Sequence, residues 1–234
     1  MASAPKPEAE LLVPGPENSA GQERLRVNEI FYSLQGESRT VGLPTVFVRL
    51  SGCPLRCGYC DTTYAFQGGS WMSLEEIGDR VARHRPRYVT LTGGEPLAQR
   101  PSTVLLERLC DAGYEVSLET SGALDISAVD QRVSVVMDIK TPGSGEEARN
   151  FYANLAHIDA NDQIKFVICD RADYEWSRAK LDELGLAGRC EILFSPSHGA
   201  VAPTELADWI LADHLPVRMQ VQLHKLLWGD SPGH

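Results

Sequence analysis

Three cysteines lie close together in the segment SGCPLRCGYCDTTYAF, which covers residues 51–66. Three residues separate Cys53 from Cys57, and two separate Cys57 from Cys60. Closely spaced thiolates are typical ligands of iron–sulfur clusters, and one short loop can reach three corners of a four-iron cube. A structural zinc ion usually takes four protein ligands in two close pairs. The spacing therefore favours a four-iron cluster whose fourth iron is open to another ligand.

The remaining cysteines do not supply an obvious fourth ligand. Cys110 lies in an apolar helix-like run, and Cys169 and Cys190 lie at the ends of strand-like runs. We expect all three to be packing residues, because a free cysteine behaves as a small hydrophobic side chain. A zinc-binding module stays open as an alternative, in which Asp61 or a distant histidine would be the fourth ligand.

The composition predicts one globular domain that binds neither nucleic acid nor membranes. The chain has 234 residues, of which 43% are hydrophobic, and this is enough for one sizeable core. Its formal net charge of -10 repels a phosphate backbone, and no apolar run reaches the roughly 18 residues of a membrane span. Residues 1–23 are rich in Pro, Glu and Ala and do not resemble a secretion signal. We therefore predict a flexible tail over residues 1–23, a single domain over residues 24–234 and a cytoplasmic location.

Strand-like and helix-like segments alternate after the tail. Strands are expected at residues 24–37, 43–52, 87–96, 114–122, 133–140, 163–169 and 190–196. Helices are expected at residues 73–84, 101–113, 146–157, 173–185 and 204–214. Ser73 and Glu76 form a capping box at the start of the first helix, and Gly113 ends the second.

This alternation predicts an α/β fold with about six βα units. A closed barrel has eight such units, so we expect an open, partial barrel of parallel strands. A doubly wound sheet is the alternative, because periodicity does not separate the two. In either fold, functional groups collect at the carboxyl ends of the strands. The segments that follow strands directly are the cysteine loop, TGGEP (92–96), ETSG (119–122), DIKTPGSGE (138–146) and FSPSHG (194–199).

The cysteine motif, with Tyr59 before its last cysteine, resembles the radical S-adenosylmethionine (SAM) superfamily. In that superfamily the open iron binds the amino and carboxylate groups of SAM, so the resemblance implies that the missing fourth ligand is the cofactor. The segment TGGEP matches the glycine-rich motif of the superfamily, where glycines let the backbone approach the methionyl amine.

A narrower resemblance is carried by FYSLQGES and GLPTVFVRLSGCPLRCGYCDTTYAF and extends from about residue 27 to residue 228. These segments resemble the 7-carboxy-7-deazaguanine synthase family of queuosine and 7-deazapurine biosynthesis. The resemblance implies conversion of 6-carboxy-5,6,7,8-tetrahydropterin to 7-carboxy-7-deazaguanine with loss of ammonia. It also implies a [4Fe–4S] cluster, SAM, Mg²⁺, a homodimer, and an electron donor such as flavodoxin or ferredoxin. The alternative is another radical SAM enzyme, such as a glycyl-radical-enzyme activase, which is not expected to carry Gln35, Arg49 and Thr62 together.

The resemblance also implies roles for individual residues, although it assigns no protein base. Cys53, Cys57 and Cys60 would bind the cluster, and Thr62 would bind Mg²⁺. The substrate would contact Leu34, Gln35, Gly36, Arg49, Thr92 and His224. SAM would contact Tyr59, Cys60, Asp61, Gly94, Asp138, Ile139, Lys140, Ser195, Pro196, Ser197 and His198.

Two of these residues leave alternatives open. Arg49 presents paired donors suited to a substrate carboxylate, but it could instead pair with a nearby acid. Asp138 departs from the family, because many members carry serine there, and its carboxylate could meet a ribose hydroxyl.

Overall fold

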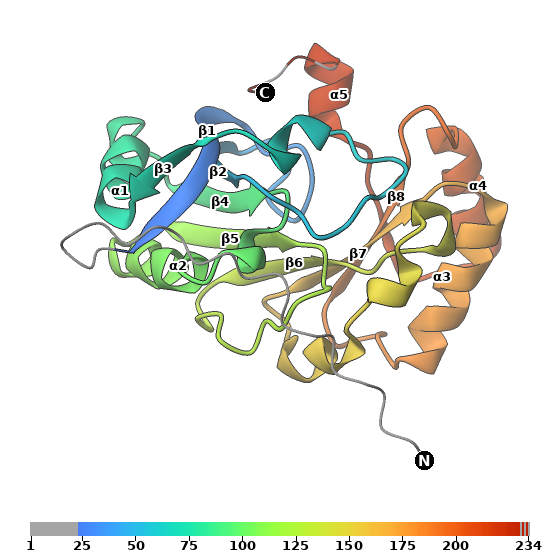
Figure 1. The fold of residues 1–234 in the computed structure, drawn as a ribbon. Helices are drawn as coiled ribbons and strands as arrows, with labels where there is room; N and C mark the ends of the chain where they lie inside the picture. The colour runs from blue at the N-terminus through green and yellow to red at the C-terminus, as the bar shows by residue number, and fades with distance from the viewer. Residues whose placement is uncertain (1–22, 230, 232, 234) are drawn as a thin grey trace.

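The computed structural model describes residues 23–229, 231 and 233, so most of the predicted N-terminal tail lies outside the described residues. Nine strands form one mixed sheet with the order β3-β1-β2-β4-β5-β6-β7-β8-β9 (Figure 1). The strands are β1 (Arg24–Leu34), β2 (Pro44–Leu50), β3 (Ser70–Ser73), β4 (Tyr88–Gly93), β5 (Glu115–Thr120), β6 (Ser134–Asp138), β7 (Gln163–Ile168), β8 (Glu191–Pro196) and β9 (Arg218–Met219).

The strand order identifies the fold as an open, partial barrel. β1 is antiparallel to both β2 and β3, whereas every neighbouring pair from β2 to β9 is parallel. Each parallel connection moves one place in the same direction, and right-handed crossovers then put the helices that connect the strands on one face of the sheet. A doubly wound sheet would reverse its order at a switch point. The prediction of an open parallel barrel is therefore confirmed over its doubly wound alternative.

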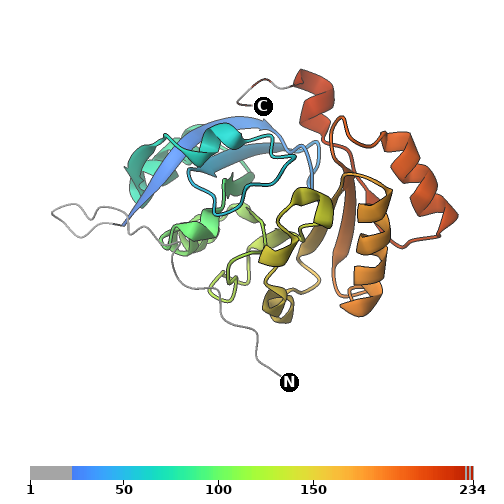
Figure 2. The same cartoon turned by 45° about the vertical axis from the view of Figure 1, so that its right-hand side comes forward.

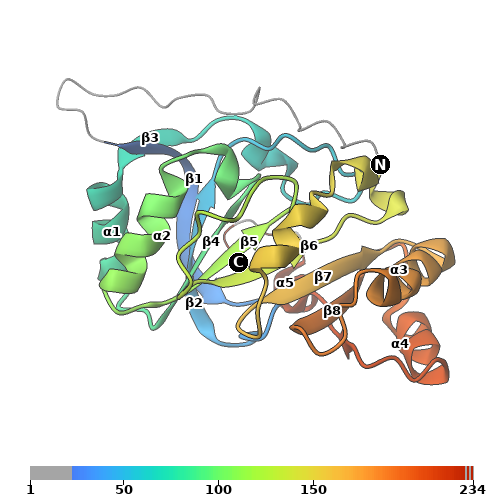
Figure 3. The same ribbon diagram turned by 90° about the horizontal axis from the view of Figure 1, so that it is seen from below.

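The four helices α1 to α4 lie outside the curved sheet, whereas α5 lies on the side of the cavity. α1 and α2 flank its first strands, and α3 and α4 flank its last strands (Figures 1 and 3). Figure 2 shows the curvature, because strands from the two ends of the sheet are steeply inclined to each other. The helices are α1 (Leu74–Arg83), α2 (Ser102–Asp111), α3 (Arg171–Glu183), α4 (Pro203–Ala212) and α5 (Leu223–Trp228). None of the helices in the described residues is long and apolar enough to cross a membrane.

Helix boundaries follow the local chemistry of the sequence. The predicted capping box begins α1, since the Glu76 amide donates to Ser73 Oγ and the Ser73 amide donates to Glu76 Oε2. Gly113 has a φ of 85° just after α2, which is the left-handed conformation that ends a helix.

The predicted helix at residues 146–157 is wrong. This segment instead contains the short 3-10 helices η4 (Glu147–Arg149) and η5 (Tyr152–His157). Between them, the Asn150 side chain accepts from the Lys140 amide and donates to the Lys140 carbonyl, both at 2.8 Å. These bonds to a strand end fix the backbone at residue 150, where it is extended, so a continuous helix cannot form.

The two faces of the parallel strands have opposite characters. Alternate residues pack against the helices in one apolar core, and they include Val46, Val48, Leu91, Leu118, Met137, Ile164, Phe166 and Phe194. The residues between them line a cavity on the other face, and they include Arg49, Thr92, Glu119, Asp138, Lys165 and Ser195. Because side chains alternate along a strand, one apolar core and one polar site share the same sheet.

The β1–β2 loop (residues 35–43) ties the two ends of the open sheet together. The Ser38 amide donates to Gln220 Oε1 at 2.6 Å, and Gln220 Nε2 donates back to the Ser38 carbonyl at 2.8 Å. The Arg39 amide donates to the Gln163 side chain at the start of β7. These contacts fix the turn at Gln35–Glu37 across the open side of the sheet.

Candidate active site

A cavity of about 830 Å³ lies at the carboxyl ends of the parallel strands. Its volume is within the range of small-molecule sites, and its position is the functional end of a partial barrel. The predicted residues that line it are Leu34, Gln35, Gly36, Arg49, Cys53, Cys57, Tyr59, Cys60, Asp61, Thr62, Thr92, Gly94, Asp138, Lys140, Ser195, Pro196, Ser197, His198 and His224. Ile139 does not line the cavity, because its side chain packs in the apolar core.

The cysteine loop is held by backbone contacts on both sides. The Gly58 amide donates to the Ser144 carbonyl at 3.0 Å, and the Glu95 amide donates to the Gly52 carbonyl at 2.8 Å. A Cβ on Gly94 would lie only 2.2 Å from the Gly52 carbonyl oxygen. Glycine is therefore required where the TGGEP turn meets the cysteine loop.

The chemistry of the cysteine loop fits a [4Fe–4S] cluster. All three of its cysteines are partly exposed toward the same cavity. In the part of the chain that the structure describes, no three His, Cys, Asp or Glu side chains converge on a point that could hold one metal ion. A cluster instead binds each thiolate through a different iron. Burial raises the pKa of the Cys53 thiol to about 11, so iron must displace protons when the cluster is loaded.

The walls beside the cysteines carry buried polar atoms that fit a polar cofactor. Lys140 Nζ lies 2.9 Å from Asp138 Oδ2 and 5.6 Å from the centre of the Tyr59 ring. Asp138 Oδ1, the Tyr59 hydroxyl and the Ser195 hydroxyl are buried and have no hydrogen-bond partner among the residues that the structure describes. Buried groups of this kind are costly unless a ligand satisfies them. The ribose, amino and carboxylate groups of SAM offer the complementary donors and acceptors.

Glu95 of the TGGEP segment supports the site without facing it. Its side chain is fully buried. Its carboxylate accepts hydrogen bonds from the Thr120 hydroxyl at 2.9 Å, from the Ser121 amide at 2.7 Å and from the Leu97 amide at 3.0 Å. Glu95 therefore fixes the end of β5 to the turn that carries Gly94.

On the other side of the cavity, polar side chains surround Glu119 at the end of β5. Gln35 Nε2 donates to Glu119 Oε1 at 3.2 Å, and the Thr92 hydroxyl donates to Glu119 Oε2 at 2.8 Å. Gln35 Nε2 also lies 3.2 Å from the Thr90 hydroxyl. Three segments that are distant in sequence thus form one hydrogen-bonded wall.

Arg49 pairs with an acid, which was the alternative to substrate binding, but it also lines the cavity. Its Nε donates to Glu29 Oε1 at 2.7 Å, and Tyr64 donates to the same oxygen at 2.8 Å. The guanidinium lies 5.7 Å from the centre of the Phe31 ring. Phe31 in turn stacks on Phe47 with ring centres 4.9 Å apart. Arg49 is therefore held in a fixed position beside an aromatic wall.

The short helix α5 covers one side of the cavity. The Leu223 amide donates to the Gly36 carbonyl at 3.0 Å, and a Cβ on Gly36 would lie 2.1 Å from His224 Nδ1. His224 Nε2 and Lys225 Nζ lie 3.9 and 3.7 Å from Asp61 Oδ2. Burial acts to raise the pKa of Asp61, but the nearby His224 and the charge of Lys225 outweigh it and lower the pKa to about 2. α5 is thus connected to both the β1–β2 loop and the cysteine loop.

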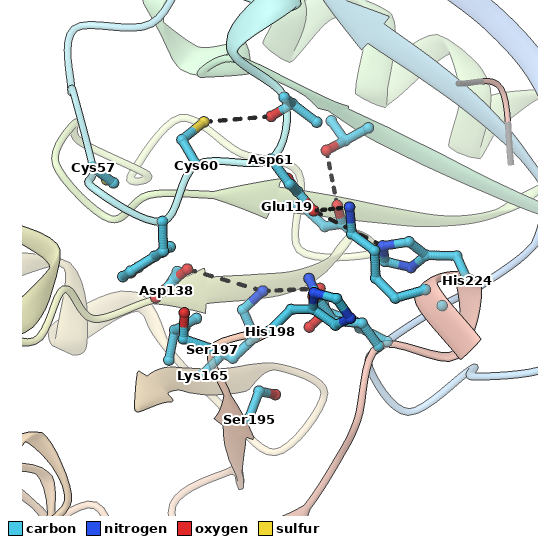
Figure 4. Close-up of a pocket in the computed structure, with 18 of the residues that line it drawn as sticks. Cys57, Cys60, Asp61, Glu119, Asp138, Lys165, Ser195, Ser197, His198 and His224 are labelled. Carbon is cyan, nitrogen blue, oxygen red and sulfur yellow. Dashed lines mark hydrogen bonds and ion pairs between the residues drawn. The ribbon is translucent and has the colours of Figure 1, made fainter. Parts of the chain in front are cut away.

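Sequence reasoning missed Lys165, which lies inside the cavity on β7 (Figure 4). Its Nζ is 3.1 Å from Glu37 Oε2 and 3.9 Å from Asp138 Oδ2. The alternation of side chains along the strand could have predicted this position. Ile164 and Phe166 face the core, so the residue between them must face the cavity.

The fold and the site define the class of protein. Residues 47–186, more than half of the chain, match the family model of the Radical SAM superfamily. This chain therefore belongs to that superfamily. Members of the superfamily use a [4Fe–4S] cluster and SAM.

Individual relatives define the family more narrowly. The 7-carboxy-7-deazaguanine synthase of Chlorobaculum tepidum is 46% identical over 209 residues, covering 88% of this chain and 94% of the relative. The protein of the same name from Koribacter versatilis is 43% identical over 219 residues, covering 87% and 97%. This chain belongs to the 7-carboxy-7-deazaguanine synthase family, whose further cofactor is Mg²⁺. The predicted family is confirmed over a zinc-binding module and over a glycyl-radical-enzyme activase.

Solved structures share the fold. The crystal structure of QueE from Escherichia coli superposes with a TM-score of 0.67 at 24% identity, covering 85% of this chain and 94% of that one. A structure of Streptococcus suis SuiB bound to its precursor peptide SuiA superposes with a TM-score of 0.56 at 13% identity, covering 75% of this chain and 48% of that one.

Proposed function

We propose that this enzyme converts 6-carboxy-5,6,7,8-tetrahydropterin to 7-carboxy-7-deazaguanine with loss of ammonia, as a step of 7-deazapurine biosynthesis. One observation carries this assignment. The three cysteines of the radical SAM motif share a single cavity with Gln35, Arg49 and Thr62, a set that other radical SAM enzymes are not expected to carry.

The cofactor side of the cavity is assigned by residue type and position. Cys53, Cys57 and Cys60 would hold the cluster, and Gly94 would let the backbone approach SAM. The remaining proposed contacts of SAM are Tyr59, Asp61, Asp138, Ile139, Lys140, Ser195, Pro196, Ser197 and His198. Ile139 can contribute only its backbone, because its side chain is in the core. When bound, the cluster and SAM supply the radical chemistry that begins the reaction on the substrate.

The pterin side of the cavity combines an aromatic wall with polar edges. The stacked rings of Phe31 and Phe47 offer an apolar surface on which the flat ring of the pterin would lie. Arg49, held by Glu29, would bind the substrate carboxylate through charge-assisted hydrogen bonds. Gln35, Thr92 and the backbone of Leu34 and Gly36 would contact the edge of the ring, and His224 would contact it from α5.

Thr62 is the proposed protein ligand of Mg²⁺. Its hydroxyl lies 3.7 Å from Cys60 Sγ, so it is next to the cluster loop on the cavity wall. A hard cation prefers oxygen ligands and keeps several of them as water or substrate groups. The substrate carboxylate would therefore complete the site.

We further propose a homodimer in the cytoplasm that takes electrons from a flavodoxin or ferredoxin and does not bind nucleic acid. Exposed apolar side chains at Leu211, Leu226 and Leu227 support a protein interface. Ligand thiols that must stay reduced support a cytoplasmic location. The net charge of -10 argues against a phosphate-binding surface. We also propose that residues 24–234 form a single domain that follows a flexible tail over residues 1–23.

The decisive experiment is an anaerobic incubation of the reconstituted protein with SAM, dithionite and the carboxytetrahydropterin. The proposal expects a product with the mass of 7-carboxy-7-deazaguanine and release of ammonia. Cleavage of SAM without consumption of the pterin would instead show that the radical acts on another substrate.

A further inference from the structure

Lys165 occupies a central position in the cavity that the reaction assigned above does not use. It projects from the inner face of β7, and only 16% of its side chain is exposed. Its ammonium lies between two carboxylates, Glu37 from the β1–β2 loop at 3.1 Å and Asp138 from the end of β6 at 3.9 Å. Figure 4 shows the Lys165 side chain extending into the cavity toward Asp138.

In both carboxylates, Glu37 and Asp138, one oxygen has a lysine partner and the other does not. Lysine nitrogens lie near one oxygen of each, Glu37 Oε2 and Asp138 Oδ2. The second oxygen of each, Glu37 Oε1 and Asp138 Oδ1, is buried without a hydrogen-bond partner in residues 23–229, although both residues line the cavity. A carboxylate oxygen in this position accepts hydrogen bonds from a ligand.

Glu37 depends on Lys165 more than Asp138 does. Asp138 has a closer cation in Lys140, at 2.9 Å. In the described part of the chain, Lys165 is the only cation in an ion pair with Glu37. The other charged or titratable groups that face Lys165 are Glu119 on β5, Lys140 after β6, and Tyr59 and Asp61 in the cysteine loop.

Lys165 itself is a permanent cation. Burial acts to lower its pKa, but the charges of Glu37 and Asp138 outweigh burial, and the pKa lies above its ordinary value. A lysine of this kind does not exchange protons near neutral pH, so its contribution must be its fixed charge.

We propose that Lys165 is a positioning residue that keeps Glu37 ionised and aims Glu37 Oε1 at the N–H groups of the pterin ring. This inference rests on the proposed function. It assigns Lys165 to recognition of the substrate and not to SAM, since Lys140 already holds the carboxylate on the cofactor side.

The test is pterin binding by the reconstituted full chain with SAM and Mg²⁺ but without reductant, so that no turnover occurs. Binding of 6-carboxytetrahydropterin is measured from about pH 6 to pH 9 for Lys165→Met, Lys165→Arg, Lys180→Met and the wild type. The wild-type measurements correct for changes in the protonation of the ligand itself. Lys180 is a matched control, because its side chain is 17% exposed and paired with Glu183 but lies on α3 and does not line the cavity.

The expected result follows from the charge of Glu37. Without Lys165, this carboxylate has no cation in an ion pair with it in the described residues, and its charged form becomes more costly, above all at the acidic end of the range. Lys165→Met should then weaken pterin binding by at least about tenfold at pH 6, and the loss should shrink by at least about threefold by pH 9. Its affinity for SAM should stay within about threefold of wild type. Lys165→Arg should show a loss that does not vary with pH, and Lys180→Met should match the wild type.

Three results would overturn the inference: unchanged pterin binding in Lys165→Met, a loss that is equal at every pH, or an equal loss of SAM affinity. If Lys165→Met does not fold, as judged by circular dichroism and iron content, the neutral pair Glu37→Gln with Lys165→Met replaces it. This double variant should bind pterin as well as Glu37→Gln alone, and weaker binding would refute the proposal. A wild type that binds the pterin but does not convert it would refute the proposed function, while the titration would still decide the role of Lys165. A wild type that does not bind the pterin would refute both.

Discussion

Replacing Gly36 by alanine should displace His224 from the cavity and slow turnover without unfolding the protein. The β1–β2 loop and α5 meet at this glycine, where the Gly36 carbonyl accepts from the Leu223 amide at 3.0 Å. Gly36 does not have a positive φ, so alanine can adopt its backbone conformation. The effect of the methyl group must therefore come from the space that it occupies.

The magnitude follows from the contact distance. A Cβ on Gly36 would lie 2.1 Å from His224 Nδ1 and 3.1 Å from the ring carbons Cγ and Cε1, whereas ordinary contact begins at 3.4 Å. The imidazole must therefore move by about 1.3 Å or more. A displacement of this size in a positioning group can cost up to about 100-fold in rate. We expect kcat/KM for the pterin to fall by about 10- to 100-fold, or about 1.4–2.7 kcal/mol of transition-state stabilisation. The free energy of unfolding should change by less than about 1 kcal/mol, because alanine also restricts the unfolded chain.

The assay is steady-state turnover together with urea denaturation, measured for Gly36→Ala, His224→Ala and the double variant. Once His224 has been shortened, the methyl group meets no ring, so the double variant should turn over about as fast as His224→Ala alone. Gly78→Ala is the control, because a Cβ there meets nothing within 4 Å. Full activity of Gly36→Ala, or a double variant whose loss is the product of the two single losses, would refute the reasoning.

Three further predictions concern the cluster, the metal and the core. Anaerobic reconstitution should give about one four-iron cluster per chain, measured by iron and sulfide content. This cluster should be lost on alanine substitution of Cys53, Cys57 or Cys60 and retained on substitution of Cys110, Cys169 or Cys190; the reverse pattern would contradict the ligand assignment. Thr62→Ala should retain both the cluster and a slow, unproductive cleavage of SAM. Its turnover of the pterin should fall by at least about tenfold, and added Mg²⁺ should not restore it. Full Mg²⁺-stimulated turnover would exclude Thr62 as the ligand. Glu95→Gln should lower the free energy of unfolding by about 1–3 kcal/mol, because its amide nitrogen would face a donor such as the Ser121 amide; an unchanged urea midpoint would show that this buried carboxylate does not support the turn.

The parts of the molecule that could be predicted are those encoded by local pattern. Cysteine spacing predicts the cluster loop, because the three thiolates proposed to bind the cluster lie on one short segment. Alternating apolar runs predict the strands, and the capping box at Ser73 and Glu76 marks the start of α1. Segments that follow strands meet at one end of the sheet whatever the details of packing, so nearly all the proposed site residues line one cavity.

The parts that could not be predicted depend on contacts between distant segments. The segment 146–157 has helix-forming residues, but Asn150 binds the backbone of Lys140, ten residues earlier, in a contact that no local pattern encodes. Arg49 pairs with Glu29 because β1 and β2 align these residues directly, with a bulge between Val27 and Glu29 that shifts the register. Lys165 was hidden for a similar reason, since its partners Glu37 and Asp138 come from two other elements.

The link between the β1–β2 loop and the last strands has a consequence for the order in which the enzyme matures during synthesis. Ser38 and its partner Gln220 are 182 residues apart. At about 5–20 residues per second, a ribosome makes Gln220 roughly 10–40 s after Ser38. The cysteine loop and its TGGEP neighbour are complete far earlier, whereas the Gln35–Glu37 turn cannot be fixed until β9 and α5 have emerged. A nascent chain can therefore acquire iron before it can hold a pterin, and the substrate side of the cavity forms last although residues 35–37 are translated before the cysteine loop.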